Sequence, residues 1–365
     1  MDIQYLLMLQ HFREATGYVL DGFFAKITHL GSLYPAIVIM ALVYWSISKK
    51  TGLYLLLADL WATFTGQTLK IICCVYRPWV RSSLIEPVAD ALSGATGYSF
   101  PSGHTLNAVT LFGGLFARTR AAAGKLKAAQ PNEVNFPQPD DAGAGRSAAG
   151  SREAVSASSR GRTRKVLSAV SWLSLALAII VPFSRNYCEV HTPQDVLVGA
   201  LIALFWLWAA GRILKACEDM NGLQRMRIVA AVTIVAAAVC IIYAACKSYP
   251  MDLAEDGSLL MNPADMVKDT YRTAAGVIGA MLGVLTEMRF ARFTTDGISM
   301  RTRILRFVGG LIVTGIVLLP VGKLLYLAVG KTIGRFLKYF LMTYVLVGGW
   351  PWVFTRIERG MEKRN

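Results

Sequence analysis

Three short polar stretches in an otherwise apolar chain contain the residue types that transfer of a phosphoryl group requires. They are residues 69–78, 97–105 and 184–195. Such a transfer needs positive charge around the phosphate oxygens, a nucleophile that accepts the phosphoryl group and an acid that protonates the leaving group. Together the stretches supply lysine and arginine side chains, two histidines and one aspartate.

The stretch SRNYCEVHTPQD, residues 184–195, brings Arg185, His191 and Asp195 into one turn. Thr192 followed by proline predicts the N-cap and first position of a helix, which puts Asp195 in the first helical turn. The carboxylate follows His191 by four residues and can hold the imidazole in one tautomer, which favours His191 as the nucleophile. Arg185 is a permanent cation that can donate two hydrogen bonds to a phosphate. In isolation, the stretch would also fit a helix cap beside a loop arginine.

Lys70 and Arg77 are the cations of the first stretch. Their spacing of seven residues is nearly two helical turns, so both project from one face. Asp59, Thr63 and Gln67 extend that face into a polar stripe, and polar groups at such a depth face the interior of a membrane bundle. We predict that both cations bind the phosphate. Two cations that extend toward water at a membrane edge are the alternative interpretation.

The stretch PSGH, residues 101–104, predicts the start of a further helix. Ser102 fits an N-cap and Gly103 allows close approach of the backbone, so free amides there can bind an anion. His104 then lies at the mouth of the same site, where it can protonate the departing alkoxide. A capping or interfacial histidine is the alternative for this stretch alone. No carboxylates, cysteines or histidines have the spacing of metal ligands, so we expect no metal or other cofactor.

The three stretches resemble the three-part signature of the type 2 phosphatidic acid phosphatase superfamily. The matching residues are Lys70-x6-Arg77-Pro78, Pro101-Ser102-Gly103-His104 and Ser184-Arg185-x5-His191-x3-Asp195. The resemblance implies a helical-bundle membrane phosphatase that works without metal through a phosphohistidine intermediate. It implies His191 as the nucleophile, Asp195 as its partner and His104 as the acid that later activates water. The phosphate ligands that it implies are Lys70, Arg77, Ser102, Gly103 and Arg185.

The composition places these stretches in a membrane protein. The chain has 365 residues, of which 54% are hydrophobic and 17% charged, and its mean hydropathy is +0.45. Apolar runs long enough to cross a hydrocarbon core of roughly 30 Å recur about nine times. They lie near residues 33–47, 52–75, 103–118, 166–183, 193–213, 227–247, 271–288, 305–326 and 338–354. We therefore predict an all-α, polytopic membrane helical bundle with about nine spans.

The net charge of +15 follows the membrane topology. Basic residues crowd every second loop, whereas residues 248–270 are acidic. By the positive-inside rule, the basic loops and the C-terminus face the cytoplasm, and the three polar stretches face outward. Because the basic residues are not interleaved with aromatic ones, we expect no nucleic-acid partner. The predicted location is the bacterial cell membrane, with the active site on its outer side.

Composition divides the chain into three parts. Residues 1–30 carry too many charges for a lipid-exposed span and are predicted to form amphipathic helices at the membrane surface. Residues 31–213 form the predicted phosphatase core. A linker at 121–165 interrupts the core, and its Ala, Gly, Ser, Pro and Arg content predicts cytoplasmic disorder. Residues 214–365 add further transmembrane helices, for which a lipid-entry groove, an oligomer contact and a separate role are open interpretations.

The function that these features favour is hydrolysis of a phosphate or diphosphate group on a membrane lipid, because the predicted site lies within reach of the membrane. The resemblance implies phosphatidic acid, phosphatidylglycerophosphate and polyprenyl diphosphates as candidate substrates. A lipid phosphotransferase is the first alternative, since the same intermediate could pass its phosphate to another acceptor. A protein that only binds or transports a phospholipid is the second, although binding alone would not need a His191–Asp195 pair.

Overall fold

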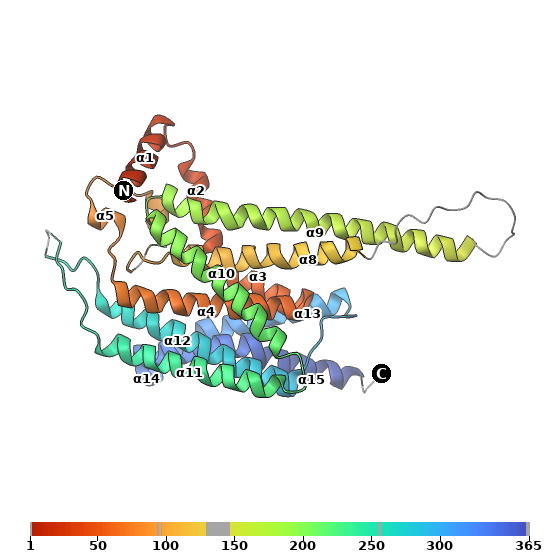
Figure 1. Cartoon of the computed structure of the whole chain (residues 1–365). Helices are drawn as coiled ribbons and strands as arrows, with labels where there is room; N and C mark the ends of the chain where they lie inside the picture. The colour runs from red at the N-terminus through yellow and green to blue at the C-terminus, as the bar shows by residue number, and fades with distance from the viewer. Residues whose placement is uncertain (1, 93–94, 96, 129–146, 255–256, 363–365) are drawn as a thin grey trace.

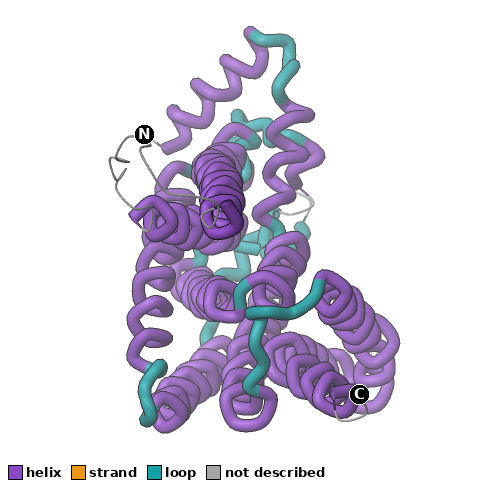
Figure 2. Tube along the Cα trace, turned by 90° about the vertical axis from the view of Figure 1, so that its right-hand side faces the viewer, coloured by secondary structure: helices purple, strands orange, loops and turns teal. Residues whose placement is uncertain are grey.

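The computed structural model describes the chain except residues 1, 93–94, 96, 129–146, 255–256 and 363–365. The described residues form helices, and an isolated bridge between Leu253 and Leu259 is their only β pairing. Figure 2, which looks nearly along many of the helix axes, shows these helices packed side by side. The predicted all-α membrane bundle is confirmed.

The helices before residue 217 include those that carry the three polar stretches. Outside the bundle lie α1 (Asp2–Ala15) and α2 (Asp21–Thr28), which project from one end of it (Figure 1). The bundle helices are α3 (Leu33–Leu42), α4 (Lys49–Cys73), α7 (Gly103–Ala108), α8 (Gly114–Ala128), α9 (Ser147–Tyr187) and α10 (Pro193–Ala216). The short helices α5 (Pro78–Arg81) and α6 (Ala89–Leu92) lie in the connection between α4 and α7. A π-helical turn at Val109–Gly113 joins α7 to α8.

The rest of the chain forms helices that pack along the other side of α4. They are α11 (Gly222–Cys246), α12 (Pro263–Thr286), α13 (Met300–Ile316), α14 (Gly322–Tyr344) and α15 (Trp350–Glu362). In Figure 1, α4 lies between these helices and the pair α8 and α9, and α10 crosses α4 diagonally. Its contacts agree, because α4 packs against α10 on one side and α12 on the other. Helix α4 is therefore shared by the two halves of the bundle.

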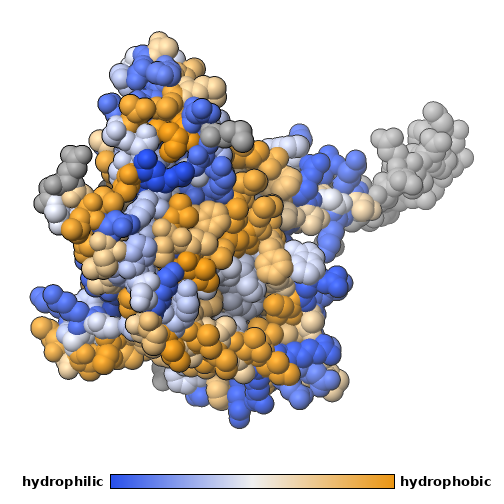
Figure 3. All heavy atoms as spheres, turned by 60° about the vertical axis from the view of Figure 1, so that its left-hand side comes forward, coloured by the Kyte–Doolittle hydropathy of each residue, from blue (hydrophilic) through white to orange (hydrophobic). Residues whose placement is uncertain are grey.

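Five of the described helical segments are long and apolar enough to cross a membrane, and the bent pair of α2 and α3 would make six if it formed one span. The five are Ser159–Tyr187, Pro193–Ala216, Gly222–Cys246, Pro263–Ala291 and Met300–Met361. The predicted count of about nine spans is not confirmed. Helix α4 has the required length, but Asp59, Gln67 and Lys70 make it more polar than these five. Figure 3 shows apolar side chains over much of the bundle and hydrophilic ones gathered at its right-hand edge and on the upper projection.

The predicted disordered linker at 121–165 is helical over most of its length. Helix α8 continues to Ala128, and α9 already begins at Ser147, so the prediction of disorder is wrong for these two parts. The alanine content explains the difference, because alanine has the highest helix propensity and each part extends a helix that is already formed. Residues 129–146 of the predicted linker lie outside the described residues.

Buried polar contacts join the two halves of the bundle at the end opposite the three polar stretches. The Lys49 ammonium donates to the Glu287 carboxylate at 2.5 Å, where the Glu287 side chain is almost fully buried. The fully buried Trp45 donates its indole N–H to the carbonyl of Leu346 at 2.9 Å. A buried charge is stable only while its partner is present, so these contacts fix how α12 sits against α4.

We expect Glu287→Leu to destabilise the protein by roughly 2–4 kcal/mol, because it leaves the Lys49 charge without its carboxylate. The double variant Lys49→Met, Glu287→Leu should recover most of that loss, since it removes both charges. Thermal unfolding of the purified protein in detergent measures the effect. The matched control is the exposed Lys50–Glu218 pair, whose disruption should change stability by about 1 kcal/mol or less. Equal losses for the two pairs would contradict the proposed importance of burial.

Candidate active site

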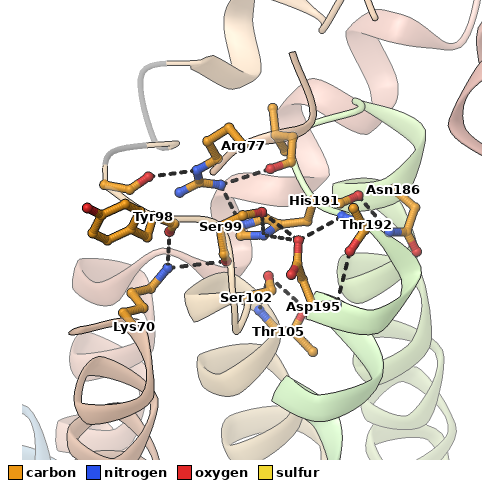
Figure 4. Close-up of polar contacts among 12 residues, drawn as sticks. Lys70, Arg77, Tyr98, Ser99, Ser102, Thr105, Asn186, His191, Thr192 and Asp195 are labelled. Carbon is orange, nitrogen blue, oxygen red and sulfur yellow. Dashed lines mark hydrogen bonds and ion pairs between the residues drawn. The ribbon is translucent and has the colours of Figure 1, made fainter. Parts of the chain in front are cut away.

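The three polar stretches meet at the end of the bundle from which α1 and α2 project. Lys70 comes from the last turn of α4, Arg77 from the loop that follows, and His191 from the turn between α9 and α10 (Figure 4). With Gly103 and His104 at the start of α7, they line one pocket of about 470 Å³. Residues more than 100 positions apart in the sequence thus share one cavity, whereas the predicted site residues Ser102, Arg185 and Asp195 are not among its lining.

The loop after α4 is shaped by its own backbone. Cys74 adopts the left-handed conformation, with φ of 50°, and its N–H donates to the carbonyl of Lys70, which ends the helix. The chain then pairs with the segment before α7, because Ser99 N–H donates to the carbonyl of Val75 at 2.7 Å. This pairing brings the first two polar stretches together. Arg77 is the N-cap residue of α5, with proline at the first helical position.

The turn that carries His191 ends in a capping box. The Thr192 hydroxyl accepts from the Asp195 N–H at 3.4 Å, and the Asp195 carboxylate accepts from the Thr192 N–H at 2.8 Å. The predicted helix start at Thr192 is therefore confirmed. One carboxylate oxygen serves both the cap and the histidine, since Asp195 Oδ2 also lies 3.4 Å from His191 Nδ1. The cap thereby fixes the position of the carboxylate relative to the imidazole.

His191 is held by both of its ring nitrogens and is 1% exposed. Its Nε2 lies 2.8 Å from Arg77 Nη1, and its Nδ1 lies 3.3 Å from the Ser99 hydroxyl. A guanidinium can only donate, so Nε2 must carry the lone pair and Nδ1 the proton. Burial and the positive charges of Arg77, Arg185 and Lys70 lower the pKa of His191 well below its usual value. The imidazole is therefore neutral at neutral pH, with its lone pair directed at the cations.

Ser99 is a site residue that the sequence patterns miss. Its hydroxyl donates to Asp195 Oδ2 at 2.5 Å, and the Ser99 hydroxyl oxygen also lies 3.3 Å from His191 Nδ1 (Figure 4). Ser99 thus bridges the histidine and its carboxylate from a third segment of the chain. The available signal was its place two residues before Pro101 of the PSGH helix start, which says nothing about which side chain Ser99 contacts.

Lys70 and Arg77 are anchored by main-chain carbonyls. The Lys70 ammonium donates to the carbonyls of Tyr98 and Ser99 at 2.6 and 3.3 Å. Arg77 donates from Nε to the Gly97 carbonyl at 3.0 Å and from Nη1 to the Val190 carbonyl at 2.8 Å. Neutral carbonyls orient these cations without cancelling their charge. Burial and the nearby Arg185 lower the pKa of Arg77 to about 9, which marks an excess of positive charge.

Arg185 is fully buried and incompletely hydrogen bonded. Its Nη1 donates to the Thr28 hydroxyl at 2.7 Å, but its Nε and Nη2 find no hydrogen-bond partner among the described residues. An unpaired guanidinium N–H inside a protein is unfavourable unless a ligand accepts from it. Arg185 interacts electrostatically with both His104 and His191, so this unused capacity lies beside the pocket. A tetrahedral oxyanion has the oxygen acceptors that these two N–H groups lack.

The stretch PSGH begins α7 as predicted, with Ser102 as the N-cap. Ser102 itself is fully buried, and its N–H donates to the carbonyl of Asp195 at 3.0 Å, so this amide is already used. Gly103 lines the pocket, and a side chain there would meet no atom within 4 Å, which leaves space beside its backbone. The His104 Nε2 lies 3.2 Å from the Ser32 hydroxyl and faces the same pocket. Gly31 is required nearby, because a Cβ there would lie 2.7 Å from the His104 carbonyl oxygen.

An N-terminal arginine also supports the site, although the sequence places residues 1–30 at the membrane surface. Arg13 of α1 is buried and donates to the Glu189 carboxylate at 2.7 Å and to the Glu86 carbonyl at 3.0 Å. Its guanidinium also pairs with Asp21 at 3.0 Å. Glu189 lies two residues before His191 and has a left-handed backbone, with φ of 58°. Arg13 therefore holds the α9–α10 turn from outside the bundle.

Among the described residues, no group of three or more histidine, cysteine, aspartate or glutamate side chains is placed to hold a metal ion. The pocket instead presents cations, histidine side chains and one wall contributed by α12 and α14. The chemistry available to these side chains is nucleophilic attack and electrostatic stabilisation of an oxyanion.

Two regions of the chain match known families. Residues 51–219 match the PAP2 superfamily, and residues 271–364 match the family described as PAP2 superfamily phosphatase, transmembrane extension. The first region contains the three polar stretches, and the second contains most of α12 and all of α13 to α15. No curated protein and no solved structure matches the chain.

We expect an oxyanion to stabilise the protein through Arg185. Vanadate or inorganic phosphate should raise the unfolding temperature of the wild type in detergent, because it accepts from the two unpaired N–H groups. Arg185→Met should remove that shift. Without a ligand, the variant should be as stable as the wild type or more stable, since it no longer buries an unpaired charge.

Arg212→Met, a change on the far part of α10, is the control and should keep the full shift. An Arg185→Met protein that unfolds at a higher temperature on addition of phosphate, as the wild type does, would show that Arg185 does not bind the anion.

Proposed function

The chain belongs to the PAP2 superfamily of membrane phosphatases, and on this basis we propose that it hydrolyses the phosphate or diphosphate group of a membrane lipid through a phosphohistidine intermediate. The observation that carries the proposal is the state of His191. Its Nε2 lone pair points at Arg77, and its protonated Nδ1 faces Asp195 and Ser99. A binding protein would have no need for a histidine poised in this way.

In the first step, His191 Nε2 attacks the phosphorus atom, and the bond between phosphorus and the lipid oxygen breaks. Lys70, Arg77 and Arg185 stabilise the charge on the phosphoryl oxygens, and His104 gives a proton to the departing oxygen. Asp195 and Ser99 stabilise the positive charge that develops on the imidazole of His191. The product is a free lipid alcohol, or a lipid monophosphate where the substrate was a diphosphate.

In the second step, a water molecule attacks the phosphoryl group on His191. His104, which has lost its proton, removes one from the water, and inorganic phosphate leaves while His191 returns to its neutral form. The same groups could activate an alcohol in place of water in this step, and the phosphate would then be transferred to that alcohol. Measuring the amounts of free phosphate and of phosphorylated acceptor distinguishes hydrolysis from transfer.

The orientation is proposed from the distribution of charge. Basic residues lie at the end of the bundle opposite the pocket, including Lys49 and Lys50 in the first turn of α4 and Arg225 near the start of α11. The positive-inside rule then puts that end and the C-terminus in the cytoplasm and the pocket on the outer side. Cysteines introduced in the 82–90 loop should react with an impermeant thiol reagent in intact cells, and cysteines near residue 219 should not.

The principal test measures phosphate release from a panel of lipid monophosphates and diphosphates. We expect His191→Ala to reduce turnover by roughly 10⁴-fold or more, because the nucleophile is lost. His104→Ala should slow turnover by about 10²- to 10⁴-fold. Chelators should leave the wild-type rate unchanged. Loss of activity in a chelator, restored by a divalent ion, would contradict a metal-independent mechanism.

His104→Ala offers a direct view of the intermediate. With water activation impaired, the variant should retain labelled phosphate from the substrate on the protein. That label should be lost in acid and kept in base, as a phosphorus–nitrogen bond requires, and it should be absent from the variant that also carries His191→Ala. A label found at another residue would overturn the assignment of His191 as nucleophile.

A further inference from the structure

The active-site pocket also has a wall from the C-terminal helices. Depth in the pocket is measured along α4, so that a lower position lies farther from Lys70 and closer to Lys49. Asp269 and Arg272 of α12 and Tyr339 of α14 line the same cavity as Lys70 and His191. Tyr34 of α3 also lines the cavity. We call Tyr34, Asp269, Arg272 and Tyr339 the polar band. The catalytic mechanism above uses none of them.

The polar band is a connected set of contacts. Arg272 Nη2 lies 3.5 Å from Asp269 Oδ1, and the Arg272 guanidinium carbon lies 5.9 Å from the centre of the Tyr339 ring. The side chains of Tyr34 and Tyr339 interact with each other, so the band spans the pocket from α3 to α14. Arg272 is 36% exposed and Asp269 is 24% exposed, which leaves both accessible from the cavity.

The depth of the polar band follows from the packing of α12 on α4. Gln67 donates to the Met266 carbonyl at 3.3 Å and to the Thr270 hydroxyl at 3.2 Å, which puts these residues at one level. The two helices run in opposite directions, so Arg272 lies below Lys70 by roughly 10 Å along the helix axis. Leu60 precedes Gln67 on α4 by seven residues, roughly 10 Å farther from the Lys70 end of the helix, and it lines the pocket together with Ile37 and Thr343.

The order of groups down the pocket is therefore cations, polar band, apolar wall. A glycerolipid phosphate has the same order: phosphate, ester-linked glycerol, hydrocarbon chains. A prenyl phosphate lacks the middle part, since its hydrocarbon begins at the phosphate oxygen. Ionisable side chains inside a membrane helix are unfavourable and are found mainly where they contact a substrate or a partner group. Asp269 and Arg272 lie six and nine residues into the membrane helix that begins at Pro263.

The charges of the polar band favour a neutral oxygen-bearing group over a second phosphate. Arg272 and the tyrosine hydroxyls can donate to ester carbonyls. Asp269 stands beside Arg272 and also interacts electrostatically with Lys70, so its carboxylate would repel another phosphate at this level. We propose that the polar band binds the ester-linked glycerol region of a glycerolipid phosphate and sets specificity for it over prenyl phosphates, an inference that rests on the proposed lipid phosphatase function.

The Asp269–Arg272 contact could also be a self-contained helix pair, and α12 offers the comparison. Lys268 pairs with Asp265 at the same spacing and at the shorter distance of 2.8 Å, but neither residue lines the pocket. The pair at Asp269 is longer and faces the cavity. Lys268→Met is therefore a matched control, because it removes a cation from the same helix without touching the pocket.

The test compares kcat/KM for dioctanoyl phosphatidic acid and for farnesyl monophosphate. We expect Arg272→Met to lower kcat/KM for phosphatidic acid by roughly tenfold to a hundredfold, as loss of charge-assisted hydrogen bonds predicts. The value for farnesyl monophosphate should hardly change. For Arg272→Lys, which keeps the charge but not the planar guanidinium, kcat/KM for phosphatidic acid should lie between the wild-type and Arg272→Met values. Lys268→Met should leave both values as in the wild type.

Equal losses of kcat/KM on the two substrates would overturn the proposal. They would mean that Arg272 acts generally, through folding or through the electrostatic field at the phosphate. A selective loss on farnesyl diphosphate would overturn it in favour of a second-phosphate site. Binding of the two monophosphates to His191→Ala protein, with and without Arg272→Met, gives the same comparison without turnover. If wild-type protein releases phosphate from no lipid, the proposed function fails. The ratio of the dissociation constants for phosphatidic acid and farnesyl monophosphate, with and without Arg272→Met, still decides the role of the polar band.

Discussion

The active site depends on holding Lys70, Arg77 and Arg185 close together inside the bundle. Their mutual repulsion and loss of hydration are unfavourable, and Asp269 is the only carboxylate among the described residues that line the pocket. Neutral acceptors bind these cations: main-chain carbonyls accept from Lys70 and Arg77, and a hydroxyl accepts from Arg185. These fix the cations while leaving their charge for a ligand. We therefore expect an anion in the pocket to offset the repulsion among these cations.

Main-chain acceptors are useful only if the loops that carry them are rigid. The left-handed Cys74 and the pairing of Ser99 with Val75 fix the loops that supply most of the carbonyls. The capping box at Thr192 fixes the turn that carries His191. Arg13 reaches the same turn from the N-terminal helix. Each of these devices uses local backbone chemistry, so the precision of the site is distributed over several short loops that are braced against one another.

The two regions matched to the PAP2 families form one structural unit around α4. That helix presents Lys70 to the pocket at one end and pairs Lys49 with Glu287 at the other. Because α12 packs along its length, the C-terminal helices become the lower wall of the cavity that the core begins. The position of Arg272 relative to Lys70, Arg77 and Arg185 thus depends on contacts at the far end of the bundle. A change in how α12 docks would alter the shape of the lipid-facing part of the pocket.

The sequence by itself determines the local features: the membrane bundle, the helix starts at Ser102 and Thr192, and the residue types that the pocket gathers. These follow from apolar runs, capping chemistry and spacing within one helical turn. Only the tertiary structure shows that Ser99 touches Asp195, that Arg13 holds Glu189 and that Arg272 enters the pocket. Those partners lie 96 and 176 residues apart in the first two cases, and no local pattern specifies which of many polar side chains will meet. Packing decides it, because each buried polar group must find its partner within the geometry that the whole bundle leaves open.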